Sequence, residues 1–198
     1  MKIVCIGRNY GEHARELGNA IPDEPVIFLK PTSALIPAHG PVRLPAFSKD
    51  IHHEIELVYR IAHRTGKAVA AQVTIGLDLT ARDVQQVLKS KGLPWEKAKA
   101  FDGSAYVADS FLDVASFPVE HHIDFMLKKN GHVVQSGHSG QMIFDVATLI
   151  EHVERYMTLE SGDLLFTGTP AGVGRMEPGD RLEGYLLGEL LFDLSVES

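Results

Sequence analysis

Apolar and polar residues alternate in several short stretches of the chain, a pattern typical of β-strands that bury one face. Glu54–Leu57 and Val73–Leu79 show this alternation, and so does Ile123–Leu127, which runs up to Asn130-Gly131. An Asn-Gly pair after an alternating segment indicates a tight β-hairpin turn. Further short apolar segments predict strands at 2–6, Val26–Leu29, Leu164–Thr167, 181–187 and 189–196. Strands therefore dominate the predicted secondary structure.

Three segments carry the apolar spacing or the capping residues of helices. Tyr10–Leu17 predicts a short helix, with Asn9 as its N-cap and Gly18 just past its end. Thr80–Asp83 has the spacing of a capping box and predicts a second helix, and Asp145 is expected to cap a third. The apolar residues that follow these caps at helical spacing are Val84, Val87 and Leu88, and then Val146, Leu149, Ile150, Val153 and Met157. Because helices and strands do not alternate regularly, we expect a strand-rich, mixed α+β fold and not a doubly wound α/β fold.

The composition is that of a globular domain. The 198 residues are 44% hydrophobic and 23% charged, which fits one domain with a sizeable core that spans residues 1–198. Four prolines between residues 31 and 49 favour loop or edge structure there over helix.

Charge and apolar patterning exclude several classes of partner. The net charge is −7 and no block of five basic residues occurs, which argues against nucleic acid or an anionic membrane as the main partner. Uninterrupted apolar runs do not exceed four residues, so neither a membrane-spanning helix nor a signal peptide is predicted. The single cysteine, Cys5, cannot form an internal disulfide, and its apolar segment predicts a buried, inert thiol. The simplest expectation is a cytoplasmic protein.

Two carboxylates, Glu54 and Glu56, lie two residues apart in one predicted strand. Because side chains alternate faces along a strand, both project from the same face, about 7 Å apart. Two anions this close repel each other, and a cation between them relieves the repulsion. A solvated outer face is the alternative interpretation, but the buriable residues Val58, Tyr59 and Ile61 follow at once.

A third carboxylate, Asp78, interrupts a strongly apolar predicted strand on the face opposite its hydrophobic row. A core strand that carries one carboxylate usually has a functional reason for it. Three carboxylates suit a hard divalent cation, Mg²⁺ first, with Mn²⁺ or Ca²⁺ as further candidates. Zinc bound through His52 and His53 is a weaker alternative, because adjacent histidines point to opposite faces of a strand and cannot both join Glu54.

Two other features carry possible chemistry. His13 and Glu16 share one face of a predicted helix, so the carboxylate can orient the imidazole as a general base. An ordinary exposed pair on a polar helix is the alternative. The glycine-rich segment Thr167–Gly174 matches neither a Walker loop nor a dinucleotide fingerprint, and indicates either a close approach of backbone to another group or a tight turn.

Seven motifs in order resemble the fumarylacetoacetate hydrolase family, and within it the small acylpyruvase and oxaloacetate decarboxylase branch. The resemblance covers nearly the whole chain, from residue 3 to about residue 195. The motifs are Gly7-Arg8-Asn9-Tyr10, Phe28-Leu29-Lys30-Pro31, His53–Leu57, Asp78–Gln85, Lys91-Gly92-Leu93-Pro94-Trp95, Lys99-Ala100-Phe101 and Thr167–Gly174.

The resemblance implies strands rolled into a compact mixed β structure, as in the catalytic C-terminal domain of the family, and a homodimer. It implies Mg²⁺ on Glu54, Glu56 and Asp78, and a catalytic dyad of His13 and Glu16 on a helix that orders as a lid over the substrate. The substrate contacts that it implies are Gln85, Lys99 and Thr169, with Arg8 as a further candidate; Lys99 is also expected to supply positive charge during catalysis.

The expected activity is Mg²⁺-dependent hydrolysis of a carbon–carbon bond in short acylpyruvates, such as acetylpyruvate or fumarylpyruvate, to pyruvate and a carboxylic acid. The small-molecule partner is then a 2-keto acid, held through its carboxylate and 2-keto oxygen. One alternative is an oxaloacetate decarboxylase, or an isomerase or decarboxylase of an aromatic catabolic pathway of the 2-hydroxyhepta-2,4-diene-1,7-dioate isomerase type. A further alternative is a metal-dependent binding module without catalysis.

Overall fold

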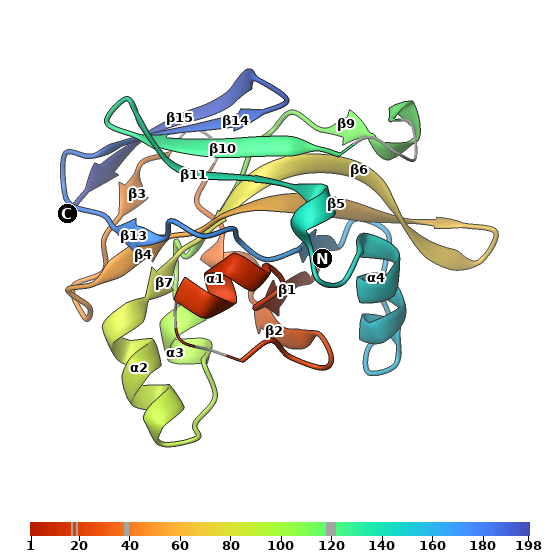
Figure 1. The fold of residues 1–198 in the computed structure, drawn as a ribbon, viewed down its shortest axis with the longest axis horizontal. Coiled ribbons are helices and arrows are strands. Elements are labelled where there is room, and N and C mark those ends of the chain that lie inside the picture. Colours follow the sequence, from red (N-terminus) through yellow and green to blue (C-terminus); the bar gives the residue numbers. More distant parts are fainter. Residues whose placement is uncertain (17, 19, 38–39, 118–121) are drawn as a thin grey trace.

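The computed structural model describes residues 1–16, 18, 20–37, 40–117 and 122–198. Two β-sheets lie one above the other, and the helices gather beneath the lower sheet (Figure 1). The helices are α1 (Gly11–Glu16), α2 (Arg82–Ser90), α3 (Glu96–Lys99) and α4 (Val146–Glu154). The strand-rich α+β architecture is thus confirmed.

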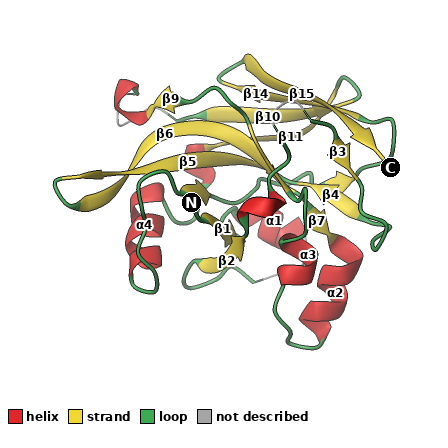
Figure 2. Ribbon diagram, turned by 180° about the vertical axis from the view of Figure 1, so that it is seen from behind, coloured by secondary structure: helices red, strands yellow, loops and turns green. Residues whose placement is uncertain are grey.

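The lower sheet has seven strands, in the order β2-β1-β12-β5-β6-β8, with β9 also paired to β6. Its centre is a long antiparallel hairpin of β5 and β6, which curves across the whole molecule (Figure 2). Only β1 and β12 pair in parallel within this sheet as described. The strands are β1 (Ile3–Gly7), β2 (Val26–Lys30), β5 (Ile55–Arg64), β6 (Lys67–Asp78), β8 (Ala105–Val107), β9 (Leu112–Asp113) and β12 (Leu164–Phe166).

The upper sheet has five strands, in the order β11-β10-β14-β15-β3. The predicted hairpin between β10 and β11 is confirmed, and both Asn130 and Gly131 have the positive φ that its turn requires (54° and 80°). A small third sheet joins β13, β4 and β7. The strands are β3 (Val42–Arg43), β4 (Ile51–His53), β7 (Thr80–Ala81), β10 (Asp124–Lys129), β11 (His132–His138), β13 (Gly174–Arg175), β14 (Arg181–Leu186) and β15 (Glu189–Glu197).

The main core lies between the two sheets, where Leu57 and Ile75 of the lower sheet pack with Leu127 of the upper one. A second apolar cluster covers the opposite face of the lower sheet and includes Val58 and the buried thiol of Cys5. The lower sheet is therefore buried on both faces along its centre. The predicted strand that carries Glu54 and Glu56 was expected to bury one face only. It is buried on both faces because this second cluster covers the other one.

Two predicted helix starts differ from the structure. No side chain caps α2, because the Thr80 hydroxyl donates to the Asp78 carbonyl at 3.2 Å and the Asp83 carboxylate accepts from the Ser48 hydroxyl at 2.6 Å. Asn9 does not cap α1, since its side-chain oxygen accepts from the Phe144 backbone amide at 2.8 Å and not from the helix. Leu17, the predicted end of α1, lies outside the described residues. The third cap is confirmed: the Asp145 carboxylate accepts from the Thr148 amide at 2.8 Å.

Candidate active site

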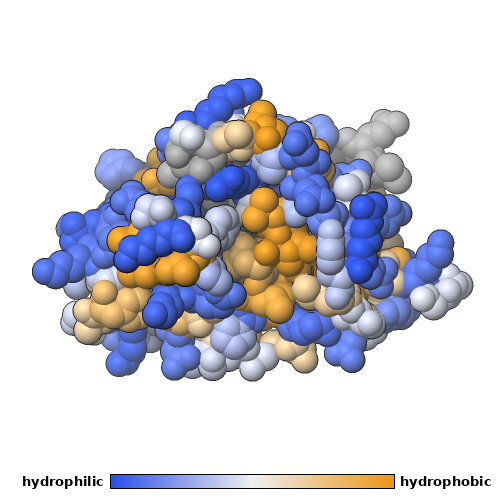
Figure 3. Space-filling view, turned by 90° about the horizontal axis from the view of Figure 1, so that it is seen from below, coloured by the Kyte–Doolittle hydropathy of each residue, from blue (hydrophilic) through white to orange (hydrophobic). Residues whose placement is uncertain are grey.

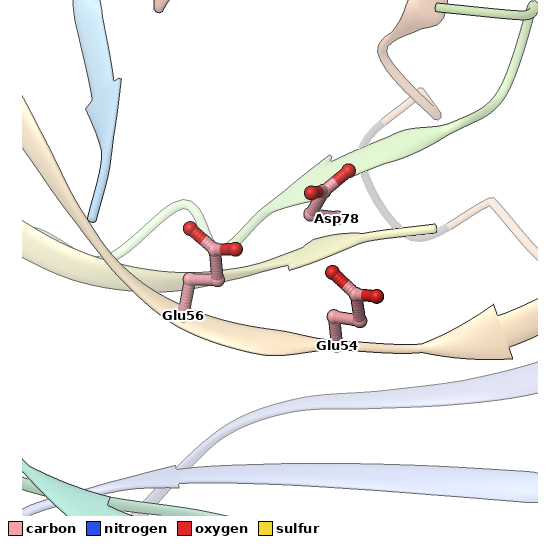
Figure 4. Close-up of side chains that lie close together, drawn as sticks. All are labelled: Glu54, Glu56 and Asp78. Atoms are coloured by element: carbon pink, nitrogen blue, oxygen red, sulfur yellow. The ribbon is translucent and has the colours of Figure 1, made fainter. Parts of the chain in front are cut away.

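Three carboxylates meet where β5 begins and β6 ends. Glu56 lies in β5, Glu54 immediately precedes it, and Asp78 is the last residue of β6. Their oxygens lie within 4.8 Å of one another, and all three residues are buried. Figure 4 shows the three carboxylate groups converging on one space. Among the residues that the structure describes, no other group of three or more acidic, histidine or cysteine side chains is placed to hold a metal ion.

The pairing of β5 with β6 explains this convergence. Glu56 lies opposite Gly76, and the Asp78 amide donates to the Glu54 carbonyl at 2.9 Å. A Cβ atom at position 76 would come within 2.4 Å of the Tyr106 carbonyl oxygen and 2.9 Å of a Val58 methyl group. A glycine is therefore required beside Glu56 for the strands to pair this closely.

Two cations compensate Glu54. The Lys99 ammonium donates to Glu54 Oε2 at 2.8 Å and to Asp78 Oδ2 at 2.6 Å, and the Arg82 guanidinium donates to Glu54 Oε1. Burial alone would raise the pKa of Glu54, but the charges of Lys99 and Arg82 hold it well below its usual range. Glu54 is therefore ionised at neutral pH.

Glu56 has the opposite electrostatic environment. Burial raises its pKa well above the usual range, and the negative charges of Asp78 and Glu54 add to the effect. The Gly168 amide, which donates to Glu56 Oε2 at 2.7 Å, offsets only part of this. A further positive charge near Glu56 would therefore stabilise the cluster electrostatically.

Asp78 Oδ1 is a buried oxygen that accepts no hydrogen bond within the described part of the chain. The Lys30 ammonium lies 2.8 Å away, but it donates to three backbone carbonyls, those of Leu79, Lys99 and Ser104. A buried carboxylate oxygen without a donor is unusual and usually has a functional explanation. The donor set and this unsatisfied oxygen together fit a divalent cation with oxygen ligands.

The glycine-rich loop after β12 connects the carboxylates to α1. Gly168, at φ 95°, presents its amide to Glu56, while the Gly172 amide donates to Glu16 Oε1 at 3.0 Å. The Thr169 hydroxyl fixes the loop by donating to the Ile55 carbonyl at 2.7 Å. Of the two interpretations of this segment, the close approach of backbone to another group is the correct one.

His13 and Glu16 form a hydrogen-bonded pair on α1. His13 Nδ1 lies 3.2 Å from Glu16 Oε2, the imidazole is buried, and the side chain of Glu16 is 34% exposed. Because the Gly172 amide also donates to the Glu16 carboxylate, the orientation of the imidazole is fixed from two elements. This is the arrangement expected of a general base with an orienting carboxylate.

A cavity of about 40 Å³ lies beside the carboxylates. The predicted site residues come together around it: Arg8, His13, Glu54, Glu56, Asp78, Gln85, Lys99 and Thr169 all line it. Glu16 adjoins it through His13. The other lining side chains include Phe28, Arg82, Lys89 and Trp95.

The histidines weighed as zinc ligands do not belong to the carboxylate cluster. His53 Nδ1 lies 2.9 Å from Gln135 Oε1, and His52 Nε2 lies 2.9 Å from Asp50 Oδ1. Each ring thus has a nitrogen paired with a neighbour outside the group that Glu54 joins.

Three buried side chains of the site were not predicted as functional residues. Arg82 and Lys30 neutralise Glu54 and Asp78, and both belong to motifs that carry the family resemblance. Gln135 of β11 belongs to no such motif. Its Oε1 accepts from the Ile55 amide at 3.1 Å, and its Nε2 donates to the Thr169 hydroxyl at 2.8 Å.

Gln135→Leu is expected to destabilise the fold by about 2–4 kcal/mol, because it leaves several buried polar groups without partners. Urea unfolding would show a lower midpoint with an unchanged slope. Gln72→Leu is the matched control: Gln72 is half-buried and its bonds with Arg60 and Asp113 are partly or fully exposed, so a loss under about 1 kcal/mol is expected. Equal losses in the two variants would contradict this role for Gln135.

A family model described as the C-terminal domain of fumarylacetoacetate hydrolase matches residues 2–191. The chain belongs to the fumarylacetoacetate hydrolase family. Among its relatives is the mitochondrial oxaloacetate tautomerase FAHD1 of Bos taurus, which is 42% identical over 98% of this chain and 91% of that protein. The mitochondrial oxaloacetate decarboxylase of Dictyostelium discoideum is 40% identical over 98% of this chain and 93% of that protein.

A solved relative in the fumarylacetoacetate hydrolase family contains a metal and a keto acid. The fumarylpyruvate hydrolase of Pseudomonas aeruginosa, in complex with Mn²⁺ and pyruvate, has a TM-score of 0.89 and 34% identity, covering 100% of this chain and 89% of that one. The family resemblance and the fold that it implied are thus confirmed.

Within the ranges that the structure describes, no helix has the length and apolar character needed to cross a lipid bilayer. The cytoplasmic location stays a prediction, and the two relatives that act on oxaloacetate are mitochondrial proteins.

Proposed function

We propose that this chain is a divalent-metal-dependent enzyme that acts on oxaloacetate, by tautomerisation or decarboxylation. The relatives named above support this alternative more than acylpyruvate hydrolysis, the activity expected first from the sequence. The observation that carries the proposal is the buried cluster of Glu54, Glu56 and Asp78, with one carboxylate oxygen left without a hydrogen bond.

Glu54, Glu56 and Asp78 would hold the cation, and Mg²⁺ or Mn²⁺ suits their oxygens. When bound there, it would act as a Lewis acid on the 2-keto oxygen of a keto acid. Lys99 and Arg82 would supply positive charge and hydrogen-bond donors to the substrate carboxylate, with Gln85 and Thr169 as further contacts. The Thr169 hydroxyl donates to the Ile55 carbonyl, so it would serve the substrate as an acceptor.

The His13–Glu16 pair gives the site a proton acceptor. Because His13 Nδ1 faces Glu16, Nε2 is the ring nitrogen available to take a proton. In tautomerisation one proton leaves C3 of oxaloacetate and one arrives at the 2-keto oxygen, and Nε2 accepts the first. A binding module without catalysis has no need for such a pair, so this arrangement argues against that alternative.

Acylpyruvate hydrolysis remains a second candidate function because a solved relative is a fumarylpyruvate hydrolase bound to pyruvate. In that reaction His13 Nε2 would take the proton from the attacking water. Both reactions use the same keto-acid contacts and differ in whether water attacks.

The test is a panel of oxaloacetate, acetylpyruvate and fumarylpyruvate with the purified protein and Mg²⁺ or Mn²⁺. Enol absorbance and pyruvate release are followed, with EDTA-treated protein as the control. We expect the highest kcat/KM with oxaloacetate, and loss of activity in EDTA that added metal restores. No turnover of any of the three keto acids would contradict the proposed function, and a higher kcat/KM for an acylpyruvate would establish the second candidate instead.

We also propose a homodimer. A groove of about 1090 Å³ lies beside the edge strand β2, distant in sequence from the carboxylates. It is lined partly by Leu29 and Tyr156, which are 43% and 65% exposed. Figure 3 shows this side of the molecule, where apolar side chains gather among hydrophilic ones. Exposed apolar surface beside an open sheet edge is commonly covered by a second copy.

Light scattering at micromolar protein is expected to give twice the monomer mass of 21.7 kDa. A mass equal to that of the monomer at these concentrations would contradict the dimer. The same measurement in high salt distinguishes apolar association from a charge-driven one, since only the latter weakens.

A further inference from the structure

The glycine-rich loop after β12 contacts both functional groups of the site. Its Gly168 amide donates to the Glu56 carboxylate at 2.7 Å, and its Gly172 amide donates to Glu16 Oε1 at 3.0 Å. Glu56 belongs to the carboxylate cluster, whereas Glu16 orients the imidazole of His13. The position of this loop therefore determines how the base lies relative to the carboxylates.

Gln135 of β11 holds this loop from the upper sheet. Its Nε2 donates to the Thr169 hydroxyl at 2.8 Å and to the Pro170 carbonyl at 3.0 Å, in the middle of the loop. Its Oε1 accepts from the Ile55 amide at 3.1 Å and lies 2.9 Å from His53 Nδ1. With the His53 proton on Nδ1, both donor hydrogens and both acceptor positions of the carboxamide are engaged. Gln135 is only 1% exposed, and it ties the loop to the start of β5.

The loop lies directly against β11. A Cβ atom at Gly172 would come within 2.1 Å of the Val134 carbonyl oxygen, and one at Gly137 would come within 3.0 Å of Pro170 Cβ. Because packing this close leaves no space on the β11 side, a loop that loses its hydrogen bonds to Gln135 can only move away from that strand. Such a movement would displace the two backbone amides that contact the site.

We propose that Gln135 is a positioning residue: through the loop it holds one backbone amide against Glu56 and a second against Glu16. This inference deepens the proposed function and rests on it, because it takes Glu56 as a metal ligand and Glu16 as the group that orients the base. Gln135 is not among the residues that line the described cavity, so it acts through these two amides and not on the substrate. Replacing a group that supports a metal ligand typically costs about 10–100-fold in metal affinity or activity.

Gln135→Glu tests this role with little change in side-chain shape. One carboxyl oxygen still accepts from the Ile55 amide, but the other carries at most one hydrogen, so a contact to Thr169 or Pro170 is lost. We expect the dissociation constant of Mn²⁺, measured by calorimetry without substrate, to rise about 10-fold or more. At saturating Mn²⁺, kcat for oxaloacetate tautomerisation is expected to fall about 10–100-fold, and KM to change less than about 3-fold.

A double variant separates positioning from a general loss of stability. Glu16→Ala removes the carboxylate that the Gly172 amide contacts, so in that background Gln135→Glu can no longer misplace the group that orients the base. At saturating Mn²⁺ and well below each melting temperature, we expect the double variant to lose less than about 3-fold in kcat beyond Glu16→Ala alone. Independent effects would instead multiply.

Gln72→Glu is the matched control. Gln72 is a half-buried glutamine of β6, and its partners Arg60 and Asp113 do not line the described cavity. This variant is expected to change neither the Mn²⁺ dissociation constant nor kcat by more than about 2-fold. If Gln135→Glu does not fold, Gln135→Asn, which keeps the amide but is one methylene shorter, is measured in its place.

An unchanged Mn²⁺ dissociation constant, or losses that multiply in the double variant, would overturn the positioning role and leave the proposed function standing. Equal effects of Gln72→Glu and Gln135→Glu would overturn it as well, and so would failure of both Gln135 variants to fold, since Gln135 would then serve folding alone. If the wild-type protein turns over no keto acid, the proposed function fails instead. The Mn²⁺ titrations of Gln135→Glu and wild type then decide on the positioning of Glu56 separately.

Discussion

Glu56→Ala is expected to remove metal-dependent turnover, by at least about 1000-fold, while the chain stays folded. A bound metal ion is expected to stabilise the transition state by several kcal/mol as a Lewis acid. Each 1.36 kcal/mol lost lowers the rate tenfold, which gives the expected loss of turnover. The fold should survive because Glu56 is a buried carboxylate whose pKa is raised by burial and by its acidic neighbours, so its removal relieves repulsion. Turnover and the melting temperature are measured on the same preparation, with and without Mg²⁺.

Two further variants test whether the loss of turnover comes from the negative charge of Glu56. Glu56→Gln keeps an oxygen for the Gly168 amide but lacks the negative charge, and it should lose turnover as fully as Glu56→Ala. Glu151→Ala removes an exposed carboxylate of α4 and should leave turnover unchanged. Full activity of either Glu56 variant, or of EDTA-treated wild type, would show that the cluster holds no catalytic metal.

His13→Ala should separate the reactions available to this site. Hydrolysis needs a base to activate water and tautomerisation needs one to take the C3 proton, and such catalysis is worth about 10²–10⁴ in rate. Decarboxylation depends mainly on positive charge at the 2-keto oxygen and on orientation. We therefore expect kcat for acylpyruvate hydrolysis and oxaloacetate tautomerisation to fall by about 10²–10⁴, kcat for decarboxylation to fall noticeably less, and KM to change little.

Glu16→Gln tests the orienting role, and it should lower the same two rates by a smaller factor because His13 keeps its place on α1. His132→Ala, an exposed change on β11, is the control. Equal losses of hydrolysis, tautomerisation and decarboxylation in His13→Ala would mean that the imidazole positions the substrate or closes the site and does not move a proton.

The parts of the site that the sequence predicted are those set by local periodicity. The two-residue spacing of Glu54 and Glu56 places both side chains on one face of a strand, whatever the rest of the chain does. Asp78 stood out because it is a carboxylate in an otherwise strongly apolar strand, and pairing of β5 with β6 brings it to the same place. His13 and Glu16 meet because three residues make nearly one helical turn.

The parts that could not be predicted depend on partners far apart in the chain. Gln135 contacts Ile55 and Thr169, which are 80 and 34 residues away, and no spacing rule connects them. The capping box predicted at Thr80 does not form for the same reason. The hydroxyl of Ser48, which lies outside the helix, donates to the Asp83 carboxylate. Burial of Glu54 and Glu56 required the second apolar cluster, which residues of several distant strands form together.

The most direct test of this account is calorimetric titration of Mn²⁺ into EDTA-treated wild type and into Glu56→Ala. We expect one site per chain in the wild type, since the described residues contain one such carboxylate cluster. We also expect Glu56→Ala to lose this site while it still unfolds cooperatively on heating. Binding of equal affinity and stoichiometry in the two proteins would contradict the claim that Glu54, Glu56 and Asp78 hold the metal.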